Sequence, residues 1–452
     1  MKKIFTTYAL LMFVLTLNAQ TTFEKSYDFY GNAFSDLVFS YDDGYLMAMI
    51  SYKSQYNLSL VKTDLNGDTL WTKDHEVEIT GLFDLNGVAD EQGNIYIAST
   101  YKNDNLWKFD KDGNLLWTKK YSTNKEEMVV KDNFLWVCGS NSAGDGNYLF
   151  KIDASTGDSL WRSPQFNGDS AWGTGSYCSS IALADNNEVI VTVSLQNAYF
   201  DVFPSKFFKL IPDANQLVEF SLNTDEQYYV SDTRSVGNEY ISIAAKTESG
   251  DDKTTNFIRY SSDGTILAEK HQLFDCRAVG LYKMAVTNDN RVVAMGFYDL
   301  AGEEKIMFHC YSMNGDSLWS TFYGENDKYA SDMKITTDGG FIITGDLNTY
   351  NNQNHPFLIK TNAMGVLTGM PEKPNTLRVL AYPNPASDAV MFTVPGLNKG
   401  VLSIYNSTGQ LCFETLMNSE KTVWNINGCK AGLYLYRVKT ASETFSGSVV
   451  VK

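Results

Sequence analysis

The fold of this chain is decided by the stretch Lys108-Phe109-Asp110-Lys111-Asp112-Gly113-Asn114-Leu115-Leu116-Trp117, because its pattern recurs along the sequence. Clear copies of Lys-x-Asp-x-x-Gly-x-x-Leu-Trp begin at Lys62 and Lys151, and a partial copy ends at Trp319. Degraded copies occupy 209–218, 259–268 and 360–369. The turn position falls at residues 67, 113, 157, 214, 264, 315 and 365, mostly 44 to 51 residues apart with one gap of 57. A period of about 40–50 residues made of short strands is typical of β-propeller blades.

A second repeat, independent of the tryptophan, has the same count. In each unit a tight polar turn precedes an apolar run, as at Asp42-Asp43-Gly44 before 45–50. The other turns lie at 92–94, 131–133, 185–187, 236–238, 289–290 and 338–340. Asp, Asn and Gly tolerate the positive φ that two-residue hairpins require. Two hairpins per period imply four strands, so the sequence predicts an all-β, seven-bladed propeller within residues 20–370.

The two ends of the repeat predict how the ring closes. The last unit ends in 365–369, which lacks the tryptophan, whereas 22–27 resembles the outer strand that begins at Trp319. We therefore expect 22–29 to pair into the last blade and to leave no free sheet edge. The tryptophans are expected to fill the wedges between neighbouring blades rather than to contact a ligand.

The N-terminus has the pattern of an export signal. Residues 1–19 combine a basic start, a short apolar stretch and a small residue at the expected cut, and they form a predicted signal peptide. The apolar stretch is too short to be a good membrane span, and no other segment could cross a membrane. No cysteine follows the cut, so a lipid anchor is not expected. We expect an exported, soluble protein.

The charge of the chain bears on its partners, and its cysteines bear on disulfides and metal binding. The chain has 37 Lys and Arg against 53 Asp and Glu, a net charge of −16, which disfavours nucleic-acid partners. Its six cysteines are widely spaced. The favoured disulfides are Cys276 with Cys310 and Cys412 with Cys429, and reduced core thiols are the alternative. The four histidines are scattered and Cys-x-x-Cys is absent, so no zinc site is predicted.

The repeat stops at Met370, and a different module follows. Residues 371–377 contain two prolines among polar residues and read as a linker. Residues 378–452 alternate short strands with tight turns and predict a small β-sandwich.

This module resembles the type A C-terminal sorting domain of the bacterial type IX secretion system (Por secretion). The shared features are Tyr382-Pro383-Asn384-Pro385, the turn with Gly409 and Gln410, the strand from Gly432 through Tyr434, and the terminal Lys452. Two departures are Asn406, where the family usually has Asp, and 446–448, where a Lys is usual. The resemblance implies interaction with the type IX machinery and delivery to the outer-membrane surface or the medium. It implies nothing about the function of the propeller.

Ligand candidates gather in the longer loops. The loops between second and third strands and those between blades share one face of a propeller, opposite the tight turns. These loops are rich in Asn, Asp and Gly, and their aromatic residues include Trp172, Tyr199, Phe200 and Tyr350. Rings beside amides and carboxylates suit a glycan or a protein ligand. Solvated loops without a ligand are the alternative.

Three carboxylates are candidates for chemistry near the channel mouth. Asp36, Asp84 and Asp332 occupy roughly one equivalent position before an inner strand. Converging carboxylates could hold Ca²⁺ or cleave a glycosidic bond. The structural alternative is that they cap nearby backbone N–H groups.

One copy of the repeat points toward an enzyme family. Residues 151–161 are similar to the tryptophan docking repeat of pyrroloquinoline-quinone dehydrogenases, where the motif joins blades and is not catalytic. This chain has seven units instead of the usual eight and no adjacent cysteine pair. No catalytic motif is found. The sequence therefore favours a non-enzymatic surface protein that binds a glycan or protein, and the alternative is a secreted carbohydrate-active hydrolase or lyase.

Overall fold

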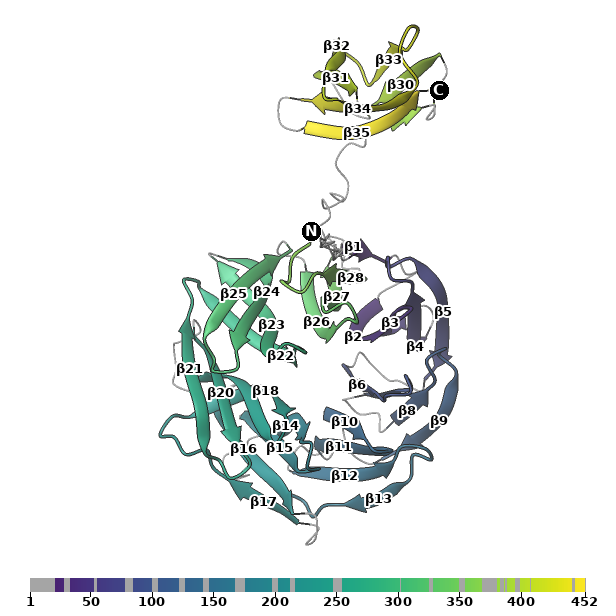
Figure 1. Cartoon of the computed structure of the whole chain (residues 1–452). Coiled ribbons are helices and arrows are strands. Elements are labelled where there is room, and N and C mark those ends of the chain that lie inside the picture. The colour runs from purple at the N-terminus through teal and green to yellow at the C-terminus, as the bar shows by residue number, and fades with distance from the viewer. Residues whose placement is uncertain are drawn as a thin grey trace, which may run out of the picture. The chain divides into compact units, whose positions relative to one another are not determined.

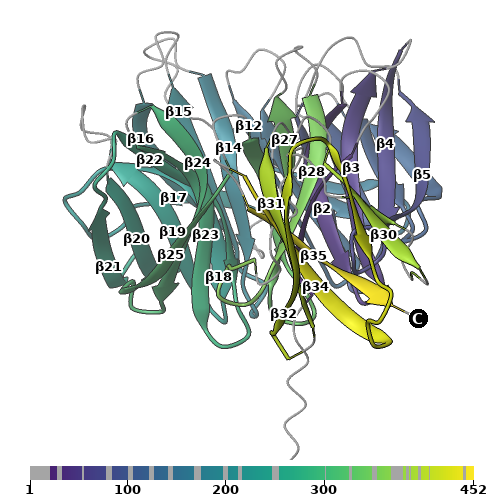
Figure 2. The same cartoon turned by 90° about the horizontal axis from the view of Figure 1, so that it is seen from above.

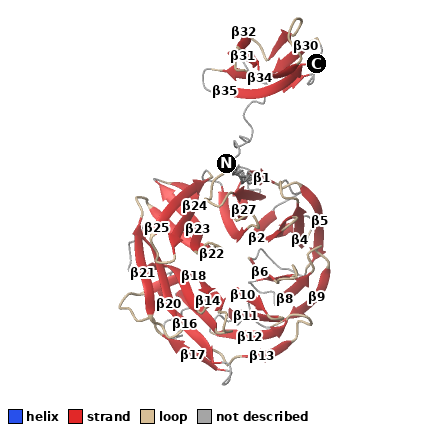
Figure 3. Ribbon diagram, in the orientation of Figure 1, coloured by secondary structure: helices blue, strands red, loops and turns tan. Residues whose placement is uncertain are grey.

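The computed structural model describes most of the chain. It covers residues 21–27, 33–52, 55–77, 84–99, 105–121, 127–140, 146–166, 175–196, 202–211, 216–246, 254–300, 302–324, 328–348, 354–367, 380–382, 386, 388–394, 399–406, 408–440 and 444–451. Strands and turns account for all secondary structure within these residues (Figure 3). The chain divides into two compact units, residues 1–371 and 372–452.

The first unit is a ring of four-stranded sheets (Figure 1), and the region that the inner strands surround is here called the central channel. Seven such sheets, blades 1 to 7, are formed by the described residues of this unit, and their strands follow one another from the channel outward. Blades 1 and 2 contain β2 (Ala33–Tyr41), β3 (Gly44–Tyr52), β4 (Tyr56–Thr63), β5 (Thr69–Glu76), β6 (Leu85–Ala89), β7 (Ile95–Ser99), β8 (Asn105–Phe109) and β9 (Leu115–Lys120). Blades 3 and 4 contain β10 (Glu127–Lys131), β11 (Phe134–Ser140), β12 (Asn147–Asp153), β13 (Ser159–Arg162), β14 (Gly175–Leu183), β15 (Val189–Gln196), β16 (Val202–Ile211) and β17 (Gln216–Phe220). Blades 5 and 6 contain β18 (Tyr228–Val236), β19 (Glu239–Lys246), β20 (Thr254–Ser261), β21 (Ile266–Leu273), β22 (Ala278–Val286), β23 (Arg291–Leu300), β24 (Glu303–Ser312) and β25 (Ser317–Tyr323).

Blade 7 joins the two ends of the propeller. Its strands β26 (Lys328–Ile335), β27 (Phe341–Asn348) and β28 (Asn354–Thr361) are completed by β1 (Phe23–Ser26) from the N-terminus. Strand β1 pairs antiparallel with β28, with Phe23 opposite Lys360. The expected closure by the N-terminal segment is confirmed.

Antiparallel pairing sorts the connections onto two faces of the ring. The tight turns within each blade lie on one face, here called the turn face (Figure 2). The connections between second and third strands and between blades lie on the other, here called the loop face. The Asp-x-x-Gly turns hold themselves closed: Asp110 Oδ1 accepts hydrogen bonds from the N–H groups of Asp112 (3.0 Å) and Asn114 (2.8 Å). This local bonding explains why Asp recurs at the start of the turn.

The apolar core of the first unit lies between blades, and the outer-strand tryptophans pack there against the next blade, as expected. Clusters of buried side chains each join one blade to the next, such as Leu37 of blade 1 with Trp107 of blade 2. At the outer rim Trp71 packs on the turn of blade 2, where a Cβ on Gly113 would lie 2.6 Å from the indole. Trp117 packs in the same way on Gly157. The turn glycine is therefore needed both for its positive φ, 74° at Gly113, and for the room it leaves.

Strand β1 repeats this contact at the ring closure. Phe23 takes the place of the tryptophan and packs on Gly67 of blade 1. Lys25 forms an ion pair with Asp68 (2.5 Å), and the Tyr27 hydroxyl donates to the Gly67 carbonyl (2.7 Å). In other blades Lys73 and Lys119 also reach the next turn, where Lys119 pairs with Asp158 (2.7 Å) and Lys73 donates to the Asp112 carbonyl (2.7 Å). The closing strand thus uses the same side-chain spacing as the outer strands.

The disulfide prediction is wrong. The structure joins Cys138 of β11 to Cys178 of β14, a link between blades 3 and 4. Cys276 and Cys310 are buried in different clusters: Cys276 packs between blades 5 and 6, and Cys310 packs between blades 6 and 7. Cys412 is exposed on its strand, and Cys429 packs against the core of the second unit, without a bond between them.

The second unit is a two-sheet sandwich. One sheet contains β29 (Leu380–Tyr382), β30 (Ala389–Thr393) and β33 (Lys421–Asn425). The other, in spatial order, contains β32 (Leu411–Met417), β31 (Gly400–Asn406), β34 (Gly432–Lys439) and β35 (Thr444–Val451). Its own core surrounds the buried Trp424.

Candidate functional site

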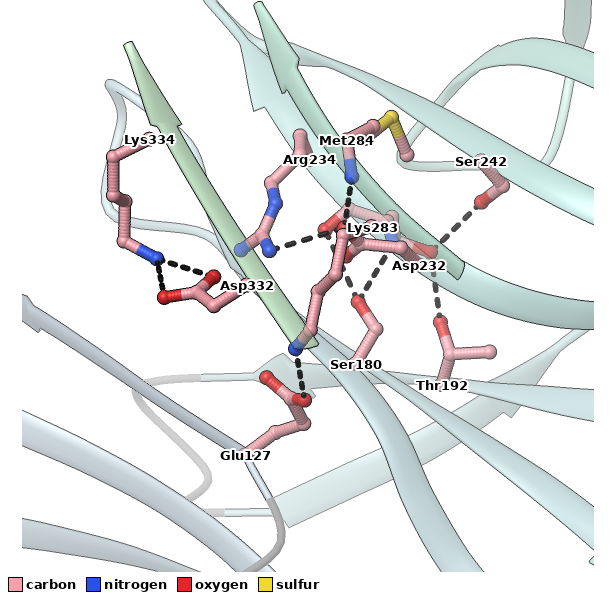
Figure 4. A network of polar contacts seen from close by, with 11 residues as sticks. Glu127, Ser180, Thr192, Asp232, Arg234, Ser242, Lys283, Met284, Asp332 and Lys334 are labelled. Carbon is pink, nitrogen blue, oxygen red and sulfur yellow. Dashed lines mark hydrogen bonds and ion pairs between the residues drawn. The ribbon is translucent and has the colours of Figure 1, made fainter. Parts of the chain in front are cut away.

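Charged side chains from the inner strands meet in the central channel (Figure 4). Glu127 of β10 and Lys283 of β22 form an ion pair, with Oε1 and Nζ 3.5 Å apart. These residues belong to blades 3 and 6, three positions apart in a ring of seven. The pair therefore bridges the channel.

Two further ion pairs flank this bridge, each within one inner strand. Asp232 pairs with Arg234 on β18 (3.0 Å), and Asp332 pairs with Lys334 on β26 (2.6 Å). Residues two apart on a strand lie on the same face of the sheet, so each carboxylate lies beside the cation of its own strand. Together with the bridge they make three carboxylates and three cations, which balance.

Burial changes the titration of the network. Burial raises the pKa of Glu127, an effect that Lys283 opposes. The Glu127 carboxylate in turn raises the pKa of Lys283, whereas burial lowers the pKa of Lys334. About a third of the Lys334 side chain (36%) is nevertheless accessible to solvent. Water reaches the network, which moderates the strength of these pairs.

The same carboxylates also connect neighbouring blades. Asp232 Oδ2 accepts a hydrogen bond from the Met284 N–H (2.9 Å), and Asp332 Oδ2 accepts one from the Val38 N–H (3.1 Å). In blade 4 the Ser180 hydroxyl accepts from the Thr233 N–H (2.9 Å). All three acceptors directly follow a β-bulge in their inner strand. A bulge leaves backbone groups outside the ladder, and these side chains bond to the next blade there.

The three candidate carboxylates have different environments. Asp36 is itself the bulge residue of β2, and its Oδ2 accepts from the Leu85 N–H of blade 2 (3.1 Å). Asp332 directly follows the bulge of its own strand, so the two positions agree only to within one residue. Asp84 is exposed, immediately before β6. Asp36 and Asp332 thus make the backbone contacts that the structural alternative describes.

A fourth carboxylate, Asp346, lies near Asp36 and was not among the candidates that the sequence predicted. Burial raises the pKa of Asp36 well above its usual range, and Asp84 and Asp346 raise it further. The Asp346 Oδ1 accepts from the Ser35 N–H (2.8 Å). Burial raises the pKa of Asp346 to about 7. Asp346 lies on a second strand, outside the repeat position that the sequence suggested.

The described parts of the chain contain no cluster of side chains that could ligate a metal ion. There, three or more His, Cys, Asp or Glu side chains nowhere gather in an arrangement that could hold a metal ion. The same residues contain no helix long and apolar enough to cross a membrane.

A cleft opens on the loop face between blades 6 and 7. It encloses about 190 Å³ and its lining includes Tyr282, Phe297 and Tyr329. The Tyr282 hydroxyl donates to the Ala330 carbonyl (2.6 Å), which fixes that ring as a wall. Tyr329 also borders the cleft, but it lies opposite Asp346, which bonds to Ser35 of blade 1, so its ring is on the other face of the blade 7 sheet. The sequence did not single out this cleft, because its walls come from strands of two blades.

The loop aromatics predicted from the sequence, Trp172, Tyr199, Phe200 and Tyr350, lie outside the described residues. The described strands on either side of each of these segments end at the loop face.

In the second unit the described part of the sorting motif forms local structure. Tyr382 ends β29, and the Gly409–Gln410 turn connects β31 to β32. Asn406 closes this turn, because its Oδ1 accepts from the N–H groups of Thr408 (3.1 Å) and Gln410 (2.9 Å). Gly432 and Tyr434 belong to β34, with Tyr434 turned into the core. The remaining motif residues, Pro383, Asn384, Pro385 and Lys452, lie outside the described residues.

The fold therefore defines a seven-bladed β-propeller followed by a small β-sandwich. Residues 380–452 match the family of secretion system C-terminal sorting domains. The chain thus carries a type IX sorting domain and is exported to the cell surface or the medium.

Several solved propellers are similar to this chain. The Dos1 propeller is 10% identical and covers 76% of this chain and 95% of its own, with a TM-score of 0.46. BamB from Moraxella catarrhalis is 11% identical and covers 72% and 96%, with a TM-score of 0.36. The β-propeller domain of the Trilobed protease from Pyrococcus furiosus is 9% identical and covers 77% and 100%, with a TM-score of 0.47. No curated protein matches the sequence.

Proposed function

We propose that this exported propeller is a binding protein that takes an extracellular glycan or protein ligand on its loop face. The observation that carries the proposal is the cleft between blades 6 and 7, where the aromatic residues Tyr282 and Phe297 line about 190 Å³ of space. Concave sites with aromatic walls and a few polar groups are the usual form of a ligand site. Trp172, Tyr199, Phe200 and Tyr350 are the further ligand contacts that the sequence predicts.

The channel carboxylates give less support to a hydrolase. Asp332 is bonded to Lys334 and to the Val38 N–H, and Asp36 is bonded to the Leu85 N–H. A glycosidase needs two carboxyl groups that face a sugar from both sides. These contacts commit both side chains to joining the blades.

The proposal can be tested with the mature chain on glycan arrays and in pull-downs with extracellular proteins. Phe297→Ala should weaken retention of the ligand, because it removes a ring from the blade 6 wall of the cleft. The control is Tyr52→Ala, which removes an exposed aromatic ring (44%) at the loop-face end of β3 in blade 1. Failure of both screens to find any ligand would refute the proposal.

A further inference from the structure

The second unit presents an apolar surface on the outside of its four-stranded sheet. Along β34, the side chains of Tyr434, Tyr436 and Val438 belong to the core of the sandwich. Because side chains alternate along a strand, Leu433 and Leu435 point outward, and about half of each is exposed (48% and 47%). An antiparallel sheet with one covered face normally carries polar residues on the other. Leucines at these outward positions are therefore unexpected on a face that meets only water.

The neighbouring strands continue this surface. Tyr405 of β31 lies opposite both Leu435 of β34 and Leu411 of β32, so the three side chains form one row across the sheet. A second row joins Leu416 of β32 to Val401 of β31. Leu411 and Leu416 are exposed by 48% and 60%. We call this surface the outer leucine face, and it comprises Val401, Tyr405, Leu411, Leu416, Leu433 and Leu435.

Polar side chains between the two rows bond to their neighbours on the same face. The Glu414 carboxylate accepts a hydrogen bond from the Ser403 hydroxyl (2.8 Å). Arg437 donates to the Tyr405 hydroxyl (2.8 Å), and its guanidinium lies 5.6 Å from the centre of that ring. Tyrosine and arginine surrounded by apolar side chains are typical of the centre of a protein–protein interface.

One end of the outer leucine face is hollow and basic. Lys399, Val401, Leu416 and Lys439 line a pocket of about 370 Å³ there. Lys439 lies opposite Val401 and so is on the same face, and both lysines are exposed. Two ammonium groups beside an apolar floor fit a carboxylate that is set in an apolar surface. The pocket therefore favours a partner with an acidic side chain next to its own apolar patch.

The role of this unit indicates what covers the face. Residues 380–452 match a sorting domain of a secretion system, and the buried cluster of this unit draws only on residues 386–451. A contiguous exposed apolar surface on a small domain marks a place where another molecule docks. Rows of side chains on a sheet pack well against a second ordered protein face. We propose that the outer leucine face docks onto a protein of the export machinery, whose apolar surface carries a carboxylate that enters the pocket between Lys399 and Lys439.

The test measures how much full-length protein reaches the cell surface and the medium in a bacterium with a type IX system. Leu435→Asn should lower this amount about fivefold or more and leave the protein in the periplasm, since it places an amide in the middle of the docking face. Val423→Asn is the matched control. Val423 is similarly exposed (53%), but it neighbours the core residue Trp424 in the other sheet and so points to the opposite side of the sandwich. The control should change export less than about twofold.

The pocket is tested by charge. Lys439→Ala should lower export about threefold or more, because it removes a charge-assisted contact to the carboxylate of the partner. Lys421→Ala is its control, since Lys421 is exposed on the same side of the other sheet as Val423. Unchanged export of Lys439→Ala would overturn the acidic character of the partner.

Other outcomes would overturn the docking face or its occupant. Normal export of Leu435→Asn, or equal losses in Leu435→Asn and Val423→Asn, would overturn the face. Co-sedimentation of the purified protein with phosphatidylglycerol vesicles, abolished by Leu435→Asn, would assign the face to lipid. A dimer in light scattering that becomes a monomer in the same variant would assign it to a second copy of the chain. If thermal unfolding shows that Leu435→Asn destabilises the protein, Leu416→Asn at the more exposed position tests the same face.

Discussion

Glu127 and Lys283 meet across the central channel although they belong to blades 3 and 6, with Oε1 and Nζ 3.5 Å apart. Most contacts in the ring join a blade to its neighbour. This pair instead ties two inner strands that share no sheet and no hydrogen-bond ladder. It holds opposite sides of the ring at a set distance.

Each single substitution in the Glu127–Lys283 ion pair should lower the free energy of unfolding by more than half of the loss in the double variant. Glu127→Gln leaves the Lys283 ammonium enclosed beside other cations, and we expect a loss of about 1–3 kcal/mol, below the range for fully buried pairs because water reaches the channel. Lys283→Met should cost a similar amount, and the double variant less than the sum. Urea unfolding of the four proteins measures the cycle. Strictly additive losses would show that the two groups do not interact.

A methyl group on a rim-turn glycine should disturb both the backbone and the next blade. Gly113→Ala forces a positive φ and places a Cβ 2.6 Å from the Trp71 ring. Gly339→Ala is the control, since its φ is similar (79°) but nothing lies within 4 Å of the new Cβ. We expect a loss of about 1–2 kcal/mol for Gly339→Ala and at least about 1 kcal/mol more for Gly113→Ala. Urea unfolding measures both losses of stability. Equal losses would mean that the contact between the new Cβ and the Trp71 ring adds no cost.

Raising the pH from 4 to 7 should destabilise the protein through Asp346. Burial raises the folded-state pKa of this group to about 7 from an ordinary value of 3.8. Between these values only the folded state holds the proton, so stability is present at low pH and is lost as pH rises, by at most about 1.4 kcal/mol per unit. Asp346→Asn keeps an acceptor for the Ser35 N–H and should flatten this slope. The exposed Asp42→Asn should not, and an unchanged slope in Asp346→Asn would contradict the assignment.

The disulfide between blades 3 and 4 should be detectable and stabilising. Peptide mass mapping without reductant should find Cys138 linked to Cys178. Replacing both with alanine should cost about 2–4 kcal/mol, because the link closes a loop of 40 residues in the unfolded chain. A Cys276–Cys310 peptide in the same map would contradict the structure.

Export of the chain should depend on residues 378–452, whereas folding of the propeller should not. Deleting residues 378–452 should leave a folded propeller that stays in the periplasm, since the buried cluster of the sandwich draws only on residues 386–451. Cell fractionation and thermal unfolding measure the two effects. Fusing the same segment and its linker to an unrelated exported protein should carry that protein to the surface. Normal surface amounts of the truncated protein would contradict this role.

The blade plan and the export module were predictable from the sequence because both rest on local rules. A turn needs Asp, Asn or Gly at set positions, and an outer strand needs an aromatic residue that reaches the next turn. Such requirements repeat with the blade and leave a period in the sequence. The closing strand was predictable for the same reason, since Phe23, Lys25 and Tyr27 keep the spacing of the other outer strands.

Only the tertiary structure decided which residues form the contacts that occur once in the ring, either across the channel or between two particular blades. The bridge from Glu127 to Lys283, the Cys138–Cys178 disulfide and the cleft between blades 6 and 7 each occur once. They depend on where ring closure brings distant strands and on which face of a sheet each side chain takes. A period records contacts that every blade makes, and a contact made once leaves no period.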